Sequence, residues 1–252
     1  MKLLLVICSF LSVPVFTKAQ QANSIGILKY TQITALIDTA NKTAIPYELQ
    51  FTRSESVSKS VGLARKLNPT DSIRIWYPPR GIDEKKLFSV YINWVKNRMV
   101  SRQQADVETV VVDDTLKPIY WKIHKDVKYF GTIKCQRAEA FVRGRTYEAW
   151  FAPEIPVSSG PWKLHGLPGL ILEASDLAGH VHFRFERLQL GVTSDQRILP
   201  PASFGQKVLN EEQFLTYHKE LTDKFHKMVR TQPGWETSKA KVKVYKIEVL
   251  PD

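Results

Sequence analysis

The sequence predicts a mainly β, α+β domain, in which a long, curved antiparallel meander sheet carries one packed helix. Short runs rich in Val, Ile, Tyr, Phe and Trp recur through most of the chain and are broken by turn residues, as strands are. Connections as short as Arg143-Gly144 and residues 176–179 suit antiparallel hairpins, and the crossover helices that parallel strands need are missing. Only one stretch, near residues 211–230, has strong helical periodicity.

The apolar runs define eleven expected strands. In chain order they are residues 25–36, 45–52, 72–77, 88–95, 107–112, 120–124, 135–142, 145–151, 169–174, 180–190 and 242–250. Residues 55–66 are a second helix candidate. No internal repeat or long Gly/Ser-rich linker divides the chain, so residues 20–252 are expected to form a single domain.

The expected helix has well-defined ends. Asn210 is a good N-cap, Gln213 stands at the reciprocal capping position, and Glu211 and Glu212 complement the positive end of the helix dipole. One apolar stripe repeats at intervals of three and four residues, and its members are Phe214, Tyr217, Leu221, Phe225 and Met228. This stripe predicts that the helix packs across the sheet.

The first nineteen residues have the pattern of a signal peptide. Lys2 supplies a positive charge, residues 3–16 are mostly apolar, and Thr17 and Ala19 are small residues at the positions that a signal peptidase reads before a cleavage site at Gln20. We therefore expect an exported protein that is periplasmic, associated with the outer membrane, or secreted. No later segment is apolar over the length that a membrane helix needs, so a soluble product is expected.

The charge balance limits the classes of partner. Loss of Lys2 and Lys18 lowers the formal net charge from +11 to +9, which favours anionic envelope components or acidic ligands. A basic surface that only keeps the protein soluble is the alternative. Export argues against nucleic acid as a partner. Cys135 is the one cysteine left after cleavage, so no internal disulfide is expected and the stability must come from a packed core.

A stiff corner precedes one of the expected strands. Pro168 fixes its own φ and favours extended geometry at Leu167, whereas Gly166 and Gly169 permit backbone angles or close approaches that a side chain would block. The unbroken apolar run after the corner, residues 170–172, predicts a strand that is covered on both faces. The corner is expected to aim this strand into the sheet and to perform no chemistry.

The run Gly166-Leu167-Pro168-Gly169-Leu170-Ile171 resembles the signature of the bacterial GLPGLI family, and the block from residue 133 to residue 176 is similar to that family's central region. The resemblance implies an exported bacterial envelope protein with a role that is not established, and it implies no catalytic residues. The expected sheet also resembles, as a fold analogy, the open half-barrel of periplasmic lipoprotein carriers.

Cys135 and two histidines are candidates for chemistry. Lys134 and Arg137 flank Cys135 and would favour a reactive thiolate, although a cysteine in a strand is commonly a small buried side chain. His180 and His182 alternate on an expected strand and would hold a metal only with a third ligand such as His165 or Asp176. A half-buried strand with a polar outer side is the alternative.

Clustered aromatic residues near Pro-rich loops are the candidates for ligand binding. They are Trp76, Tyr77, Trp150, Phe151 and Trp162. Such side chains line apolar pockets, but they equally close the core of a sheet.

Motifs for nucleotide binding, for zinc proteases and for serine hydrolases are absent from the sequence, so no cofactor is expected. The predicted function is a non-enzymatic module in the envelope that binds or carries an apolar ligand or a protein partner. A thiol- or His-dependent enzyme and a purely structural component are the alternatives.

Overall fold

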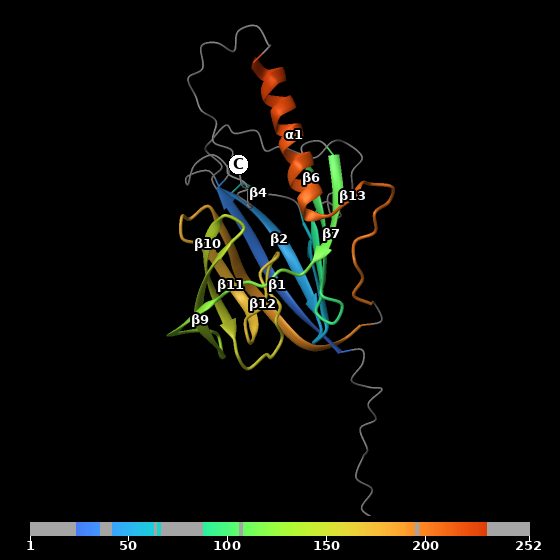
Figure 1. Ribbon diagram of the computed structural model, residues 1–252. Helices are drawn as coiled ribbons and strands as arrows, with labels where there is room; N and C mark the ends of the chain where they lie inside the picture. The colour runs from blue at the N-terminus through green and yellow to red at the C-terminus, as the bar shows by residue number, and fades with distance from the viewer. Residues whose placement is uncertain are drawn as a thin grey trace, which may run out of the picture.

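A computed structural model describes residues 24–35, 42–62, 65–66, 88–105, 108–194 and 197–230. Within these residues the chain forms thirteen strands of one sheet and one helix (Figure 1). The elements are β1 (Ser24–Ala35), β2 (Lys42–Phe51), β3 (Glu55–Ser60), β4 (Arg65–Lys66), β5 (Ser89–Asn93), β6 (Arg98–Ala105), β7 (Glu108–Thr115), β8 (Lys122–Phe130), β9 (Ile133–Val142), β10 (Arg145–Ala152), β11 (Leu170–Asp176), β12 (Val181–Thr193), β13 (Val208–Leu209) and α1 (Glu211–Arg230).

The sheet consists of two meanders that meet at its centre. Strands β1, β2, β3, β5, β6 and β7 form the first meander, and β8 to β12 form the second. Antiparallel pairing of β1 with β12, from Ser24 opposite Thr193 to Thr34 opposite Val181, joins them. Among the described strands, only the short pair of β13 with β7 is parallel, and the two-residue β4 pairs with β2. The predicted mainly β, antiparallel meander with one helix is therefore confirmed.

The connection between the meanders makes the sheet curl. Strands β7 and β8 are ten strand spacings apart in the sheet order, which is about 48 Å in a flat sheet. Only residues 116–121 connect them, and a chain of this length spans at most about 25 Å. The sheet must therefore bend until these two strands approach each other at one end. The sheet is still open, because the outermost described strands, β13 and β8, do not pair.

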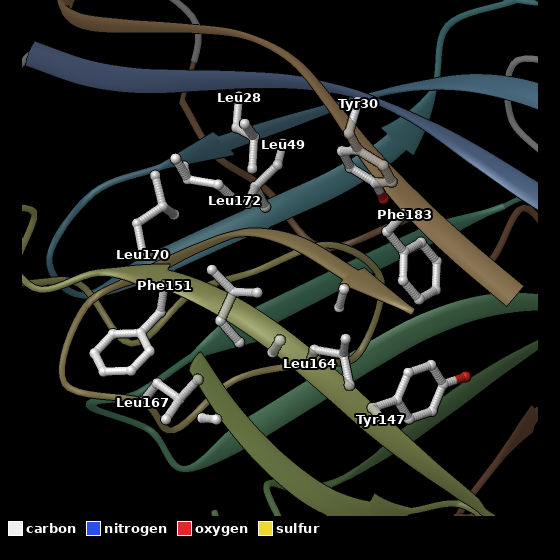
Figure 2. Close-up of a cluster of buried hydrophobic side chains, with 14 of the residues drawn as sticks. Leu28, Tyr30, Leu49, Tyr147, Phe151, Leu164, Leu167, Leu170, Leu172 and Phe183 are labelled. Atoms are coloured by element: carbon white, nitrogen blue, oxygen red, sulfur yellow. The ribbon is translucent and has the colours of Figure 1, made fainter. Parts of the chain in front are cut away.

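A loop from the second meander fills the inner face of the curl, which we define as the face that carries Tyr30, Tyr47 and Phe183. In this loop, residues 153–169, Leu164 and Leu167 are fully buried (Figure 2). They pack in one core cluster with side chains from β1, β2 and β9 to β12. The loop folds back on the sheet through two backbone bonds: Leu170 N–H donates to Ile155 O (3.0 Å) and Ile171 N–H to Ser159 O (2.9 Å). The curl therefore encloses a packed core.

Helix α1 begins as the sequence predicts. The Gln213 N–H donates to Asn210 Oδ1 (2.8 Å), and Gln213 Oε1 accepts from the Asn210 N–H (2.9 Å), which is the expected capping box. Phe214 is buried against Val110 and Val112 of β7, with Tyr217 and Leu221 beside it. No helix among the described residues is long and apolar enough to cross a membrane.

Most predicted strands lie at or near their expected positions, but the helix candidate at 55–66 is wrong. This stretch contains β3 and β4. In β3, Ser56, Ser58 and Ser60 are buried next to Leu49 and its neighbours on β2, so the alternation that marks a strand is carried by small polar side chains. Strand β6 was not predicted, since its sequence RMVSRQQA is largely polar. The strands expected at 72–77 and 242–250 and the leader at 1–19 lie outside the described residues.

The Gly-Leu-Pro-Gly-Leu-Ile corner is an entry to a strand, as predicted. Gly166 has a φ of 90°, which favours glycine, and a Cβ at Gly169 would lie 2.3 Å from the Ala152 carbonyl oxygen. Pro168 is exposed and ends before β11 begins at Leu170. Residues 170–172 are fully buried, in agreement with a strand covered on both faces. The two glycines thus have different tasks: one makes the turn, and the other allows two backbone segments to touch.

We expect Gly169→Ala to lower the free energy of unfolding by about 2–3 kcal/mol, because the added Cβ meets the backbone of Ala152 and Pro153 rather than a movable side chain. The measurement is guanidinium denaturation of both proteins. Gly131→Ala is the control: nothing lies within 4 Å of its new Cβ, so only its positive φ costs stability, about 1 kcal/mol. A Gly169→Ala variant that is no less stable than the control would contradict the close approach.

Candidate functional site

The three aromatic candidates that the structure describes do not line one pocket. Trp150 and Phe151 are neighbours on β10 and therefore point to opposite faces of the sheet. Phe151 is fully buried in the main core cluster, whereas Trp150 is half-buried and its indole N–H donates to Glu148 Oε1 (3.2 Å). Trp76 and Tyr77 lie outside the described residues. Of the candidates that the structure describes, Phe151 is a member of the main core cluster, and Trp150 and Trp162 are partly buried and pack against it.

Trp162 fills the inside of the curl. Its ring stacks on Phe183 (centroids 5.9 Å apart, planes at 17°) and contacts Tyr147 (6.1 Å). The backbone N–H of Trp162 donates to the Tyr30 hydroxyl (3.1 Å), and the φ of 55° at Trp162 shows that the surroundings impose a conformation that a bulky residue rarely adopts. The same ring packs against the cluster of Val90, Ile92 and Met99 in the first meander. Trp162 thus closes the core between the two meanders.

Cys135 is buried, and its surroundings favour the protonated thiol. Its exposed fraction is 0%, and burial, the main cause, raises the pKa of its thiol to about 12, with Glu154 and Glu173 adding to the rise. The flanking residues do not favour the thiolate as the sequence suggested. The Lys134 side chain is exposed, and the Arg137 guanidinium is held by carboxylates. The arrangement supports the alternative interpretation of Cys135 as a small core residue.

A hollow of about 330 Å³ lies beside Cys135. Its lining combines apolar and charged residues, which are Val127, Lys134, Cys135, Gln136, Pro153 and Glu154. This volume is at the lower end of the range for small-molecule sites. Because β8 and β9 contribute four of these residues, the hollow lies next to a sheet edge.

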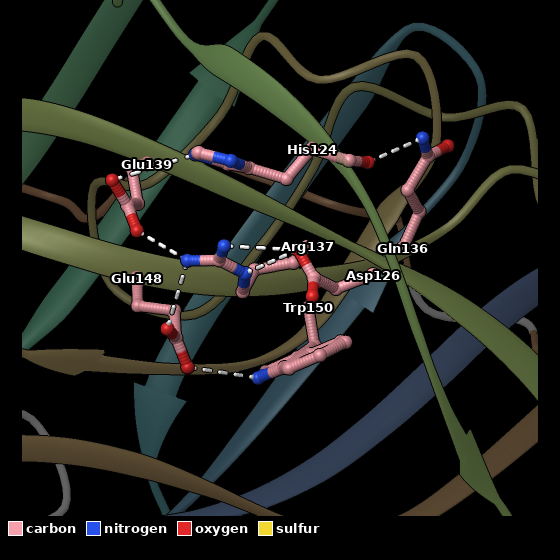
Figure 3. A network of polar contacts seen from close by, with 7 residues as sticks. All are labelled: His124, Asp126, Gln136, Arg137, Glu139, Glu148 and Trp150. Carbon is pink, nitrogen blue, oxygen red and sulfur yellow. Dashed lines mark hydrogen bonds and ion pairs between the residues drawn. The ribbon is translucent and has the colours of Figure 1, made fainter.

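Beside the hollow, Arg137 is the centre of a polar network on β8 to β10 (Figure 3). Its guanidinium donates to Asp126 Oδ2 (2.9 and 3.0 Å) and to Glu139, and it lies 3.5 Å from Glu148 Oε2. The register of β8 against β9 shifts between Ile123 and Val127, and this bulge turns the Asp126 carboxylate back onto Arg137. The His124 ring lies 3.4 Å from Glu139, and His124 O accepts from the Gln136 side chain (2.7 Å). The network therefore holds a distorted edge strand in place.

The two histidine candidates contact different carboxylates. His180 lies in the turn before β12, where its Nδ1 is 3.6 Å from Asp176 Oδ2, and that same oxygen accepts from Arg145 (2.7 Å). The His182 ring is 3.7 Å from Glu173 Oε2. Asp176 also accepts from the Val181 N–H (2.7 Å), so it ties together the ends of three strands. Neither arrangement brings three ligands to one point in the part of the chain that is described.

His165, the suggested third ligand, has a structural position. It is buried, and its ring nitrogens face two backbone carbonyls, those of Lys163 (2.8 Å) and Lys117 (3.0 Å). The Trp121 indole N–H donates to His165 O (2.8 Å). Burial is the main cause that lowers the pKa of His165 below its ordinary value, which favours the neutral ring. His165 therefore fixes the 153–169 loop to the connection between β7 and β8.

Exposed apolar side chains gather along β8. Five of the twelve large apolar residues that are most exposed lie on this strand, just before it or on its neighbour β9, and they are Tyr120, Ile123, Val127, Tyr129 and Phe141. Among the described strands β8 pairs only with β9. Within the described strands, β8 is thus an edge that carries apolar surface, next to the hollow at Cys135. The sequence does not reveal this surface, because apolar and charged residues alternate irregularly across the bulge.

A short segment of the chain matches a family model. The model of a family described as "Protein of unknown function (Porph_ging)" matches residues 141–173, which include the Gly-Leu-Pro-Gly-Leu-Ile corner. No curated protein matches the sequence.

The similar solved structures are distant. Two structures of PNGF-II, in space groups C2 and P21, are 15% and 12% identical, with TM-scores of 0.48 and 0.49. Each match covers 79% of this chain, which spans only about a third of the PNGF-II chain (33% and 34%). An uncharacterized conserved protein from Thermus thermophilus is 7% identical (TM-score 0.35), with 77% of this chain and 94% of that chain covered.

We expect the Cys135 thiol to resist iodoacetamide in the folded protein and to react once denaturant is added, because it is buried and protonated at neutral pH. Mass spectrometry of the intact chain measures the adduct. In the control, Lys134→Cys combined with Cys135→Ala, the thiol is exposed one residue away and should react without denaturant. Rapid alkylation of Cys135 in the folded protein would contradict this prediction and support the thiol enzyme hypothesis.

Glu173 should make stability depend on acid. Burial alone would raise the pKa of its carboxyl, but His182, Lys128 (2.7 Å) and the Phe185 N–H (3.2 Å) outweigh it and lower the pKa to about 2. The carboxylate therefore stabilises the fold above the unfolded value near 4.5, and this contribution disappears as the pH falls towards 2.

Urea unfolding of the wild type and Glu173→Gln should differ by about 1–3 kcal/mol at pH 6, with a difference that vanishes near pH 2. A difference that stays constant over this interval would show that the carboxylate has no such role.

Proposed function

We propose that this protein is an exported bacterial envelope protein of the GLPGLI group and acts without catalysis, by binding a protein partner at its β8 edge. The leader-like residues 1–19 support export, and the matched segment 141–173 contains the signature of that group. Its interior argues against a carrier of apolar ligands, since Trp162, Leu164 and Leu167 occupy the inner face. Binding therefore has to use the outside of the described fold.

The observation that carries this proposal is the apolar surface along β8. Ile123, Val127 and Tyr129 share one face of β8 and are 45%, 47% and 62% exposed, and Tyr120 (85%) comes just before the strand. Phe141 (73%) lies on the other face, beyond the end of the β8–β9 pairing. Neighbouring exposed apolar residues beside charged ones are typical of interaction surfaces, and tyrosine is favoured at interfaces. The candidate residues for catalysis support an enzyme less well than this surface supports binding. The Cys135 thiol is buried and protonated, and His180 and His182 each lie beside a carboxylate.

A photo-crosslinking side chain placed at Tyr129 or Phe141, in the cells that export the protein, should give discrete adducts heavier than the chain alone. The same group at Val95 or Leu199, which are also exposed but lie away from β8, is the control and should give none. Gel mobility and mass spectrometry of the adducts measure the result. Adducts that are equally frequent from all four positions, or absent from the β8 positions, would count against a partner at this edge.

A further inference from the structure

The backbone of β8 is arranged to accept another strand. It contains nine residues and pairs, within the described part of the chain, only with β9. In an antiparallel edge strand every second residue points its N–H and C=O away from the sheet, so outside the bulge at residues 124–126 β8 offers a row of unpaired donors and acceptors. An extended polypeptide is the ligand that satisfies such a row.

The charges on this edge select the partner. Lys122, Lys125 and Lys134 are exposed, and no carboxylate of the described residues pairs with them. Of the nearby acidic groups, Asp126 and Glu139 are already bound to Arg137, and Glu154 lies at the hollow, so lysine charge prevails along β8 itself. Lysines on an edge repel another strand of the same charge, which disfavours a second copy of β8. They equally disfavour the chain's own C-terminal stretch, which contains Lys239, Lys241 and Lys243.

The hollow beside Cys135 gives this edge a place for a side chain. Val127 and Lys134 belong both to the hollow and to the β8–β9 hairpin. A strand added to β8 would place alternate side chains over Val127, where the apolar lining suits an aliphatic group and the Lys134 ammonium suits a neighbouring carboxylate. Backbone pairing, charge and the hollow thus point to the same kind of ligand.

We propose that β8 binds an extended acidic segment of a partner protein, which adds to the sheet as a further strand. This inference rests on the proposed function and specifies its partner. Binding then combines backbone hydrogen bonds along β8 with charge pairing to its lysines, while residues that alternate with the acidic ones contact Ile123, Val127 and Tyr129.

The probe is a fluorescent peptide of about ten residues with alternating Glu and Val, long enough to pair with β8. Two control peptides separate the contributions: one has Lys in place of Glu, and the other keeps the Glu residues but has Pro in place of Val. Anisotropy with the full chain should show binding of the Glu–Val peptide alone, weakened by added salt. Hydrogen exchange of the β8 amides should slow at least about tenfold when this peptide is bound.

Variants test the location. A triple variant should bind the Glu–Val peptide with an affinity at least about tenfold lower, because attraction becomes repulsion. Its substitutions are Lys122→Glu, Lys125→Glu and Lys134→Glu. The matched control reverses Lys96, Lys219 and Lys224, which are exposed elsewhere, and should change affinity less than about twofold. Circular dichroism verifies that both variants fold, and the exchange measurement on the wild type needs no variant.

Three results would overturn the inference. Equal binding of the Pro-containing peptide would mean charge attraction without strand addition. An unchanged affinity in the β8 variant would place the peptide elsewhere. Slow exchange of the outward β8 amides without peptide would mean that the chain itself or a second copy occupies the edge, and dilution distinguishes these two. If Tyr129 still gives crosslinks but the Glu–Val peptide does not bind, the partner binds β8 in another way. That result contradicts strand addition by an acidic segment and leaves the proposed function intact.

Discussion

The fold depends on the short connection between β7 and β8, which lie near opposite ends of the sheet. Residues 116–121 hold β7 and β8 within about 25 Å of each other, although ten strand spacings separate them along the sheet. A curled sheet has an inner face that must be filled, and the 153–169 loop fills it with Leu164, Leu167 and Trp162. Contacts of Lys117 and Trp121 with His165 bind the connection to this loop. The 116–121 connection thus both forces the sheet to curl and anchors the loop that fills the curl.

The Gly-Leu-Pro-Gly-Leu-Ile corner ends this loop, which explains why two glycines occur so close together. Gly166 turns the backbone under the connection, where Ile119 O and the Trp121 ring lie 3.9 and 3.8 Å from its missing Cβ. Gly169 then brings the chain into contact with Ala152, at the start of the same loop. The loop is consequently closed at its base before β11 enters the core. A motif with this task specifies the packing of the interior and leaves the outside of the sheet free to differ in function.

Sequence alone predicted the parts of the fold that are encoded locally. The capping box of Asn210 and Gln213, most strands of the two meanders and the glycine corner each depend on residues a few positions apart, so their patterns are visible in the chain. Strand β3 was mistaken for a helix, because three of its four buried positions are serines and hydrophobicity does not mark them. The pairing of β1 with β12 and the partners of Cys135 and His165 arise from residues distant in sequence, and no local pattern contains them. The aromatic candidates were grouped because they lie close together in the sequence near Pro-rich loops. In the structure, strand alternation places Trp150 and Phe151 on opposite faces of β10.

An open sheet has two edges, and this protein treats them differently. At β7, the short parallel strand β13 covers part of the edge, and α1 packs on Val110 and Val112 beside it. Tyr217 of this helix also bonds to Glu108 at the start of β7. At β8, the described residues provide no such cover, and the bulge fixed by Arg137 and Asp126 distorts only the middle of the strand. Lysines limit pairing with like-charged strands but leave Ile123, Val127 and Tyr129 in solvent. If the lysines served only to prevent edge-to-edge pairing, polar residues would suit those three positions better. Their apolar character is explained when the edge repels other copies of itself and accepts a partner strand of opposite charge.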